Sequence, residues 1–395
     1  MKKNFLMLLI GTIVVISVII ISSKKTDPKE FASTILKKAD VQINGNRPWD
    51  IIVHDDRMYA RVLSEGSLGL GESYMDGWWD CKALDQFFYK ILSAQLDQKI
   101  PWNVTTLLHF LHAKLLNLQT KERAFQVGEQ HYDLGDDLFA AMLDKHMIYS
   151  CGYWKDAKNL EQAQEHKLEL ICKKLQLKPG MKVLDIGCGW GGLAHYMAQH
   201  YGVSVVGVTI SKEQAATAQR INEQLPVTIH LQDYRDLNES FDRIVSVGMF
   251  EHVGTKNYDT YMSVAHRCLK DDGLFLLHTI GNDQTNVTPD TWINKYIFPN
   301  GILPSITQIG TAIDGKFVME DWHNFGADYD PTLMAWHANF EKAWPQLQKK
   351  YGNRFYRMWN YYLLSCAGLF RSRGAQLWQV VLSKNGMPGG YRSVR

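Results

Sequence analysis

The sequence predicts an α/β fold, in which an open parallel sheet follows a smaller, mostly helical N-terminal domain. Two observations carry this prediction. From residue 182 to the end, short apolar runs typical of buried strands alternate with segments of helical periodicity. The first of these runs leads directly into a turn with four glycines and then into a helix. Strand, glycine turn and helix in this order are typical of a site that binds a nucleotide at a helix N-terminus.

Length and composition narrow the class of protein. The chain has 395 residues, which is enough for one large domain and a smaller one. Its 46% apolar and 21% charged residues are typical of a globular protein. The net charge of +2, without a basic cluster, argues against binding to nucleic acid. The six cysteines form no C-x-x-C pair, so we expect reduced thiols rather than a metal site or a disulfide framework.

An uncharged apolar run, residues 5–21, stands between two pairs of lysines near the N-terminus. Its length is near the lower limit for a helix that spans a bilayer, about 17 residues. We expect residues 1–25 to form a membrane anchor. A cleaved signal peptide is the alternative, although no clear A-x-A-like cleavage site follows the run. A buried core helix is disfavoured because the run has no polar face.

Residues 26–119 are expected to form a small N-terminal domain that contacts lipid or the membrane. Its pattern predicts a helix at residues 31–39 and a strand at residues 51–53. The three glycines of Gly66–Gly71 predict a tight, nonrepetitive path. Leucines at helical spacing predict a further helix, which packs on its own domain or lies against a membrane; they are Leu107, Leu108, Leu111, Leu115 and Leu118.

Residues 120–395 are expected to form the main domain. The histidine and aspartates of residues 131–137 are interpreted as helix-capping groups rather than metal ligands, because no second ligand cluster follows. A polar and aromatic turn at Tyr149–Trp154 precedes an amphipathic helix at Leu160–Leu175. The predicted strands lie around Val183–Leu184 and at residues 203–208, 227–231, 241–247, 274–277, 317–322 and 376–383.

Polar residues stand at the predicted carboxyl ends of five strands. They are Asp185, Thr209, Asp233, Glu251 and His278. Ligands of open parallel sheets bind at this edge, so these side chains are expected to meet in one site. Ser211 is expected to cap the following helix, with Gln214 completing a capping box. A long insertion past Ile297, which begins F-P-N-G-I-L-P-S and precedes the last strands, is expected to form a lid or substrate wall. The aromatic residues between 336 and 362 are expected to be core or to line an acyl tunnel.

The glycine turn reads D-I-G-C-G-W-G, with Asp185 ahead of Gly187, Gly189 and Gly191. A dinucleotide site more often reads G-x-G-x-x-G, with its acid about 20 residues later. The turn therefore resembles motif I of class I S-adenosylmethionine (SAM) methyltransferases, which have a Rossmann-like sheet. One departure is that Thr209 stands where an acid usually ends the second strand.

Nine blocks in order give a more specific resemblance to bacterial cyclopropane-fatty-acyl-phospholipid synthases. The blocks are E-G-S-L-G-L-G-E-S-Y-M-D-G-W-W, H-Y-D-L-G, Y-S-C-G-Y-W, V-L-D-I-G-C-G-W-G-G, G-V-T-I-S-K-E-Q, G-M-F-E-H-V-G, L-H-T-I-G, W-I-N-K-Y-I-F-P-N-G and F-G-A-D-Y. Two features depart from the family: Asp136 replaces the usual asparagine, and the apolar N-terminal run is not typical.

The resemblance implies transfer of a methylene group from SAM to the cis double bond of an unsaturated phospholipid acyl chain. The resemblance also implies that a carbocation forms and is deprotonated by bound bicarbonate. The implied SAM contacts are Tyr149, Ser150, Asp185, Gly187, Gly189, Gly191, Thr209, Gln214, Asp233 and Tyr234. The implied bicarbonate holders are Cys151, Glu251, His278, Tyr329 and the backbone of Ile280, with a proton shared among Glu251, His278 and the anion. Cys366 matches a cysteine proposed as catalytic in the family.

Location and partners follow from the same resemblance. Because SAM is cytosolic, we expect the protein at the cytoplasmic face of the inner membrane, bound peripherally or anchored by residues 1–25. Its partners are expected to be membrane phospholipids, and a homodimer is compatible with the resemblance. Two alternatives stay open: a SAM-dependent lipid methyltransferase that gives a methyl-branched or hydroxylated product, and an inactive lipid-binding protein.

Overall fold

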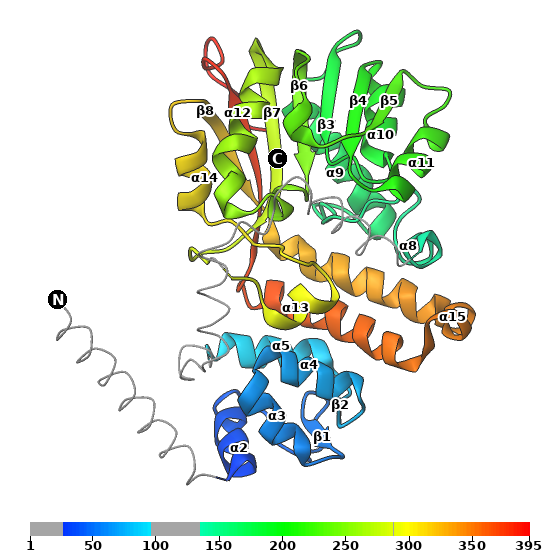
Figure 1. Cartoon of the computed structure of the whole chain (residues 1–395), viewed down its shortest axis with the longest axis vertical. Coiled ribbons are helices and arrows are strands. Elements are labelled where there is room, and N and C mark those ends of the chain that lie inside the picture. The colour runs from blue at the N-terminus through cyan, green and yellow to red at the C-terminus, as the bar shows by residue number, and fades with distance from the viewer. Residues whose placement is uncertain (1–26, 96–134, 287) are drawn as a thin grey trace, which may run out of the picture.

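The computed structural model describes residues 27–95, 135–286 and 288–395 (Figure 1). The predicted anchor at residues 1–25, the leucine-rich helix at residues 107–118 and residues 131–134 lie outside the described residues. Within the described ranges, no helix is both long and apolar enough to cross a membrane.

A seven-stranded sheet forms the upper half of the molecule in Figure 1, with the order β5-β4-β3-β6-β7-β9-β8 among the described residues. The strands are β3 (Lys182–Ile186), β4 (Ser204–Thr209), β5 (Val227–Leu231), β6 (Phe241–Val247), β7 (Leu269–Gly281), β8 (Val318–Asn324) and β9 (Gln376–Ser383). Strands β3 to β7 are parallel, whereas β9 runs antiparallel to both β7 and β8. The predicted α/β fold is confirmed, with an antiparallel edge that the sequence pattern did not predict.

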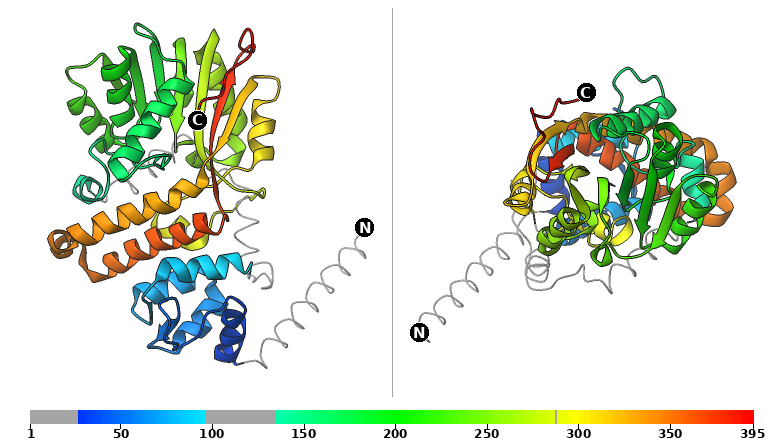
Figure 2. Two further views of the ribbon diagram at one scale, coloured as in Figure 1. Left: turned by 180° about the vertical axis from the view of Figure 1, so that it is seen from behind. Right: turned by 90° about the horizontal axis from the view of Figure 1, so that it is seen from above.

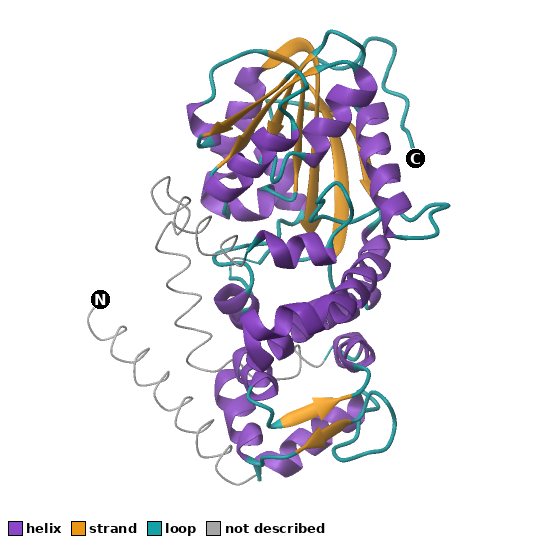
Figure 3. Cartoon of the chain, turned by 90° about the vertical axis from the view of Figure 1, so that its right-hand side faces the viewer, coloured by secondary structure: helices purple, strands orange, loops and turns teal. Residues whose placement is uncertain are grey.

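Helices cover both faces of this sheet (Figure 3). They are α9 (Leu160–Lys174), α10 (Gly192–Tyr201), α11 (Lys212–Ile221), α12 (Tyr258–Cys268) and α14 (Ile306–Ile313). Successive residues of β3 serve opposite faces, because side chains alternate along a strand. Val183 packs in the core under α9 and α10, and Leu184 packs in the core under α12 and α14.

The N-terminal unit, coloured blue to cyan in Figure 1, is mostly helical. It contains α2 (Pro28–Lys38), β1 (Ile51–Val53), α3 (Arg57–Glu65), α4 (Ser67–Met75), β2 (Trp79–Cys81) and α5 (Leu84–Ser93), with β1 antiparallel to β2. The predicted helix at residues 31–39 and the predicted strand at residues 51–53 are confirmed.

The helix α15 (Tyr329–Arg371) lies between the N-terminal unit and the sheet in Figure 1 and in the left view of Figure 2. It is kinked at Gly352, where φ is 75°. One hydrophobic core joins α15 to α5, α8 (Asp136–Met142) and α13 (Thr291–Tyr296). The predicted helical aromatics Trp336, Phe340 and Trp359 are buried in this core. Short 3-10 turns complete the described elements: η2 (Tyr234–Asp236), η3 (Phe250–His252), η4 (Thr255–Asn257) and η5 (Gly326–Asp328).

The predicted nonrepetitive path at Gly66–Gly71 is confirmed at Gly66, a turn with φ of 61° between α3 and α4, but is wrong for Gly69 and Gly71, which lie inside α4. A Cβ atom on Gly69 would lie 2.4 Å from the carbonyl oxygen of Arg61, and one on Gly71 would lie 2.2 Å from Cδ1 of Trp292. These glycines allow α4 to approach α3 and α13 closely, so the glycine spacing reflects helix packing rather than a turn.

Gly71→Ala is therefore expected to destabilise the fold, although alanine is the better helix former by about 1 kcal/mol. The added methyl group meets the ring of Trp292, and overpacking of this kind costs about 1–3 kcal/mol. The matched control is Gly310→Ala in α14, where a Cβ atom meets nothing within 4 Å and the change should stabilise the protein. Urea unfolding of both variants measures the difference; equal midpoints would contradict the packing argument.

Candidate active site

The glycine turn after β3 presents bare backbone at the carboxyl edge of the sheet. Gly187, Gly189 and Gly191 have φ values of 84°, 54° and 82°, a region that favours glycine. A Cβ atom on Gly187 would lie 2.7 Å from Met249, whereas one on Gly189 would meet open space. Gly191 instead faces α11, where its Cβ atom would lie 2.9 Å from that of Ala218. The first two glycines thus shape the turn, and the third allows helix packing.

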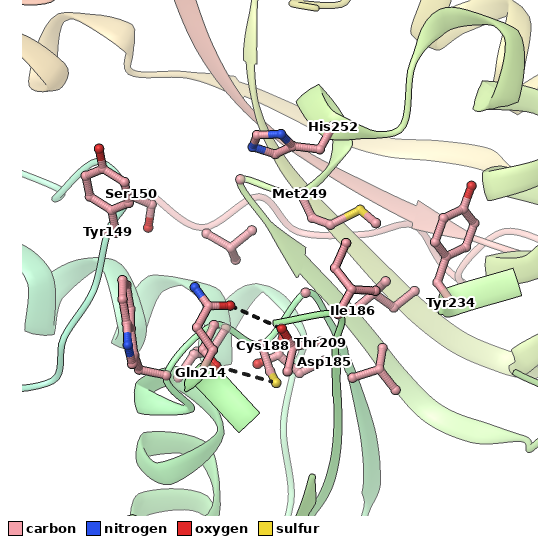
Figure 4. Close-up of a pocket in the computed structure, with 18 of the residues that line it drawn as sticks. Tyr149, Ser150, Asp185, Ile186, Cys188, Thr209, Gln214, Tyr234, Met249 and His252 are labelled. Atoms are coloured by element: carbon pink, nitrogen blue, oxygen red, sulfur yellow. Dashed lines mark hydrogen bonds between the residues drawn. The ribbon is translucent and has the colours of Figure 1, made fainter. Parts of the chain in front are cut away.

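A pocket opens over this turn, and we call it the glycine-turn pocket (Figure 4). Nine of the ten predicted SAM contacts line it, with Gly191 as the exception: Tyr149, Ser150, Asp185, Gly187, Gly189, Thr209, Gln214, Asp233 and Tyr234. Sequence reasoning missed several further lining residues, among them Lys167, Arg235, Met249 and His252. In Figure 4, Tyr149 and Ser150 lie on the opposite side of the pocket from Tyr234.

The end of β4 and the start of α11 form a hydrogen-bonded corner of the pocket. The Thr209 hydroxyl donates to Oε1 of Gln214 over 3.1 Å, as the dashed line in Figure 4 shows. Ser211 caps α11 as predicted, accepting from the backbone N–H of Gln214. The predicted return bond of the capping box is replaced, because the Ser211 N–H donates to Thr209. Thr209 and Gln214 are therefore held in fixed orientations toward the pocket.

Two acidic groups of the pocket have different surroundings. Asp233 accepts from the backbone N–H and Nε of Arg235, both over 2.9 Å. Asp185 is buried, and its Oδ2 has no hydrogen-bond partner within the described residues. Burial raises the pKa of Asp185 to about 7, opposed by the positive charge of Lys167. Asp185 is thus a buried carboxyl group available to a ligand.

A second group of predicted residues, the Glu–His cluster, adjoins this pocket. It consists of Cys151, Glu251, His278, Ile280 and Tyr329. Two chain segments connect it to the pocket: Cys151 follows the lining residues 149–150, and Glu251 stands between the lining residues Met249 and His252. The Gly248 N–H donates to the carbonyl oxygen of His278, which holds the Glu251 turn against β7.

Glu251 and His278 each present one unpartnered buried atom. Glu251 Oε1 accepts from the Ile280 N–H over 2.7 Å, whereas Oε2 has no partner in the described part of the chain. His278 Nδ1 lies 3.2 Å from the Gln379 amide nitrogen, and its Nε2 is likewise without a partner there. Burial raises the pKa of Glu251 to about 7 and lowers the pKa of His278. Near neutral pH, the imidazole of His278 is therefore uncharged, and the carboxyl group of Glu251 is protonated in part of the molecules.

Tyr329 and Cys151 belong to the same buried region. Burial raises the pKa of Tyr329, and the groups that raise it further include Cys151, Glu251 and Cys366. The Tyr329 ring stacks on Phe370 with centroids 4.2 Å apart. Burial also raises the pKa of the Cys151 thiol, and that of the Cys366 thiol to about 12. Both thiols and the phenol are therefore protonated at neutral pH.

These pKa values predict how stability depends on pH. Between about pH 4.5 and 7, Glu251 and Asp185 each hold a proton in the folded chain that the unfolded chain has lost. Each group then lowers the free energy of unfolding by about 1.4 kcal/mol for every unit of pH increase. Glu251→Gln should remove one of the two contributions. Urea unfolding from pH 5 to 7 measures the slope; an unchanged slope in the variant would contradict the assignment.

Comparison with known proteins gives consistent matches. The family described as mycolic acid cyclopropane synthetase matches residues 119–380. The chain is 62% identical over 364 residues to the cyclopropane-fatty-acyl-phospholipid synthase of Escherichia coli K12, covering 92% of this chain and 95% of that protein. It is 34% identical to cyclopropane mycolic acid synthase 2 of Mycobacterium leprae, covering 65% of this chain and 92% of the relative.

Solved structures give the same result for the fold. The cyclopropane synthase MmaA2 from Mycobacterium tuberculosis superimposes with a TM-score of 0.63 at 33% identity, covering 68% of this chain and all of that one. The mycolic acid cyclopropane synthase CmaA1, complexed with SAH and CTAB, superimposes with a TM-score of 0.61 at 34% identity, covering 66% of this chain and 98% of that one.

Proposed function

The chain belongs to the SAM-dependent cyclopropane-fatty-acyl-phospholipid synthases, and on this premise we propose how its two adjoining sites divide the reaction. Its reaction is methylene transfer from SAM to an unsaturated phospholipid acyl chain. We propose that the glycine-turn pocket holds SAM and that the Glu–His cluster holds bicarbonate. The second assignment depends on two buried atoms that have no hydrogen-bond partner among the described residues, Glu251 Oε2 and His278 Nε2.

The glycine-turn pocket has the features that SAM requires. When bound there, SAM supplies an electrophilic methyl group on a sulfonium. Gly187 and Gly189 let a ligand lie against bare backbone, and Asp185 offers a buried carboxyl oxygen without a partner. We propose that Thr209 and Gln214 bond to hydroxyl groups of the ligand, and that Asp233 and Tyr234 contact its aromatic ring and amine. These residues hold the donor close to the acceptor, which a weak nucleophile such as an alkene requires.

The Glu–His cluster suits a small anion that carries a proton. Bicarbonate, when bound, supplies a base for the proton released as the ring closes. We propose that neutral His278 accepts at Nδ1 from the Gln379 amide, which places its proton on Nε2, an atom without a partner among the described residues. Glu251 at a pKa of about 7 shares a proton with the anion, and the protonated Tyr329 hydroxyl is a further donor. We propose that these three side chains, with Cys151, hold the base.

We propose roles for two predicted catalytic residues, Ile280 and Cys366, that differ from what the resemblance alone implies. The Ile280 N–H donates to Glu251, so we propose that Ile280 acts by fixing this carboxyl group rather than by touching the anion. Cys366 is half-buried on α15 and keeps a protonated thiol. Because the reaction needs no thiolate nucleophile, we propose that Cys366 contributes to the apolar wall beside Tyr329.

Mass spectrometry of lipids from a host that expresses the protein tests the reaction. The expected phospholipids gain one CH₂ group and lose the acyl double bond. A hydroxylated or methyl-branched product would instead show that ring closure does not follow methyl transfer. Unchanged lipids, together with no SAM binding in calorimetry, would indicate an inactive lipid-binding protein.

We further propose that the protein works at the cytoplasmic face of the membrane, on unsaturated phospholipids. Support comes from the resemblance and from the apolar run at residues 5–21, which precedes the described part of the chain. Deleting residues 1–25 should move the protein from the membrane fraction to the soluble fraction, if this run is the anchor. An unchanged distribution would favour peripheral binding through the rest of the chain.

A further inference from the structure

Lys167 is a buried charge that the proposed reaction does not use. It stands on α9 with 1% of its surface exposed, and it lines the glycine-turn pocket. Its ammonium group donates to the Ser150 hydroxyl over 2.7 Å. An ammonium group has three donors, and Ser150 is the one hydrogen-bond partner that the described residues give it. Burying a charge is costly unless the charge is paired, so this site calls for a counterion.

A second buried lysine on the same helix shows the contrast. Lys174 has no exposed side-chain surface, yet its Nζ lies 3.7 Å from a carboxylate oxygen of Asp321 and 3.0 Å from His323 Nδ1. Lys167 has no such carboxylate: Asp144 and Asp185 act on it electrostatically, but neither forms an ion pair with it in the described ranges. Burial lowers its pKa to about 8, so it is still mostly protonated at neutral pH.

The α9 helix also fixes the position of Ser150. The Gln164 side chain, one turn before Lys167, donates to the Ser150 carbonyl oxygen over 2.8 Å. The backbone and the hydroxyl of Ser150 are thus both held by α9. Ser150 lies across the pocket from Tyr234 in Figure 4, whereas the basic lining residue Arg235 is paired with Asp233 near Tyr234. The positive charge of Lys167 therefore lies on the Ser150 side of the pocket, opposite Tyr234.

The two charged groups of the pocket that form no ion pair within the described residues match one end of SAM. Its amino-acid end carries one carboxylate and one ammonium group, whereas its adenosine end is neutral. The pocket offers Lys167 for the carboxylate and Asp185 Oδ2 for the ammonium group. We propose that Lys167, together with the Ser150 hydroxyl, binds the carboxylate of SAM and so orients the sulfonium toward the Glu–His cluster. The proposal rests on SAM being the ligand of the glycine-turn pocket.

Calorimetric titration of the full chain with SAM and with decarboxylated SAM tests this role. Decarboxylated SAM keeps the sulfonium and the amine but lacks the carboxylate. The unaltered protein should bind it about tenfold to a hundredfold more weakly than SAM, the range for a charge-assisted hydrogen bond. Equal affinities for the two ligands in the unaltered protein would overturn the proposal without any variant. No binding of either ligand would instead contradict the SAM assignment of the pocket.

The variant Lys167→Gln removes the charge but keeps a donor for Ser150. It should weaken SAM binding about tenfold or more and leave decarboxylated SAM within about threefold, so that the preference disappears. Lys174→Met, on the same helix and equally buried, is the matched control and should keep the preference. If Lys167→Gln lowers both affinities equally, Lys167 only supports Ser150 and the proposal fails. If it does not fold, Lys167→Arg keeps the charge and should retain the preference; a lost preference there would contradict the proposal.

Discussion

Replacing Glu251 with glutamine is expected to reduce product formation by at least about a hundredfold, while SAM binds with nearly unchanged affinity. The carboxyl group is buried, accepts from the Ile280 N–H through Oε1 and has its pKa raised to about 7. Glutamine keeps the acceptor for Ile280 but cannot exchange a proton near neutral pH. Loss of a group that takes part in proton transfer typically costs about 10²–10⁴ in rate.

The measurement is the rate of methyl transfer to lipid vesicles, made alongside calorimetric titration with SAM. His278→Ala should behave in the same way, because His278 is proposed to hold the same anion and is not among the residues that line the glycine-turn pocket. A loss of SAM affinity as large as the loss of rate would show that Glu251 belongs to donor binding rather than to the proton-accepting site.

Gly189→Val, unlike Glu251→Gln, is expected to weaken SAM binding itself, with the Kd for SAM raised at least about a hundredfold. Gly189 has a φ of 54°, which strains a residue with a branched side chain. A Cβ atom there meets no protein atom within 4 Å, so the added side chain would project into open space beside the pocket floor. The ligand would then lose its approach to the backbone of the turn.

Titration of the folded variant with SAM measures this effect. Gly180→Val is the matched control, because Gly180 also has a positive φ, 84°, and open space around its Cβ position, yet does not line the pocket. The control should lose stability without losing SAM affinity. Equal SAM affinity in Gly189→Val and in the unaltered protein would contradict the proposal that the glycine turn binds SAM.

Strands and site residues were predictable where neighbouring residues in the sequence alone determine the local structure. The bounds predicted from the apolar runs at β5, β6 and β9 are those of the strands in the structure, and the glycine turn marks the end of β3. The direction of β9 was not predictable, because a fully buried strand reads the same in either direction. The helix α4 was missed because its glycines are required by Trp292, which is distant in sequence.

Two functional side chains were missed for the same reason. Lys167 stands on the buried face of α9, at helical spacing from Leu160, Gln164 and Ile171, and this spacing could have revealed it. Gln379 lies between apolar residues in the middle of β9 and is paired in register with His278. A polar residue on an apolar face signals a buried partner, but the partner itself is visible only in the fold.

The central claim is that an anion held by Glu251 and His278 accepts the proton beside the SAM pocket. The direct test is the rate of product formation in buffer freed of carbon dioxide, with and without added bicarbonate. The rate is expected to fall on depletion, to recover with bicarbonate, and to show no response to it in Glu251→Gln. A rate in depleted buffer equal to that with bicarbonate would contradict the account.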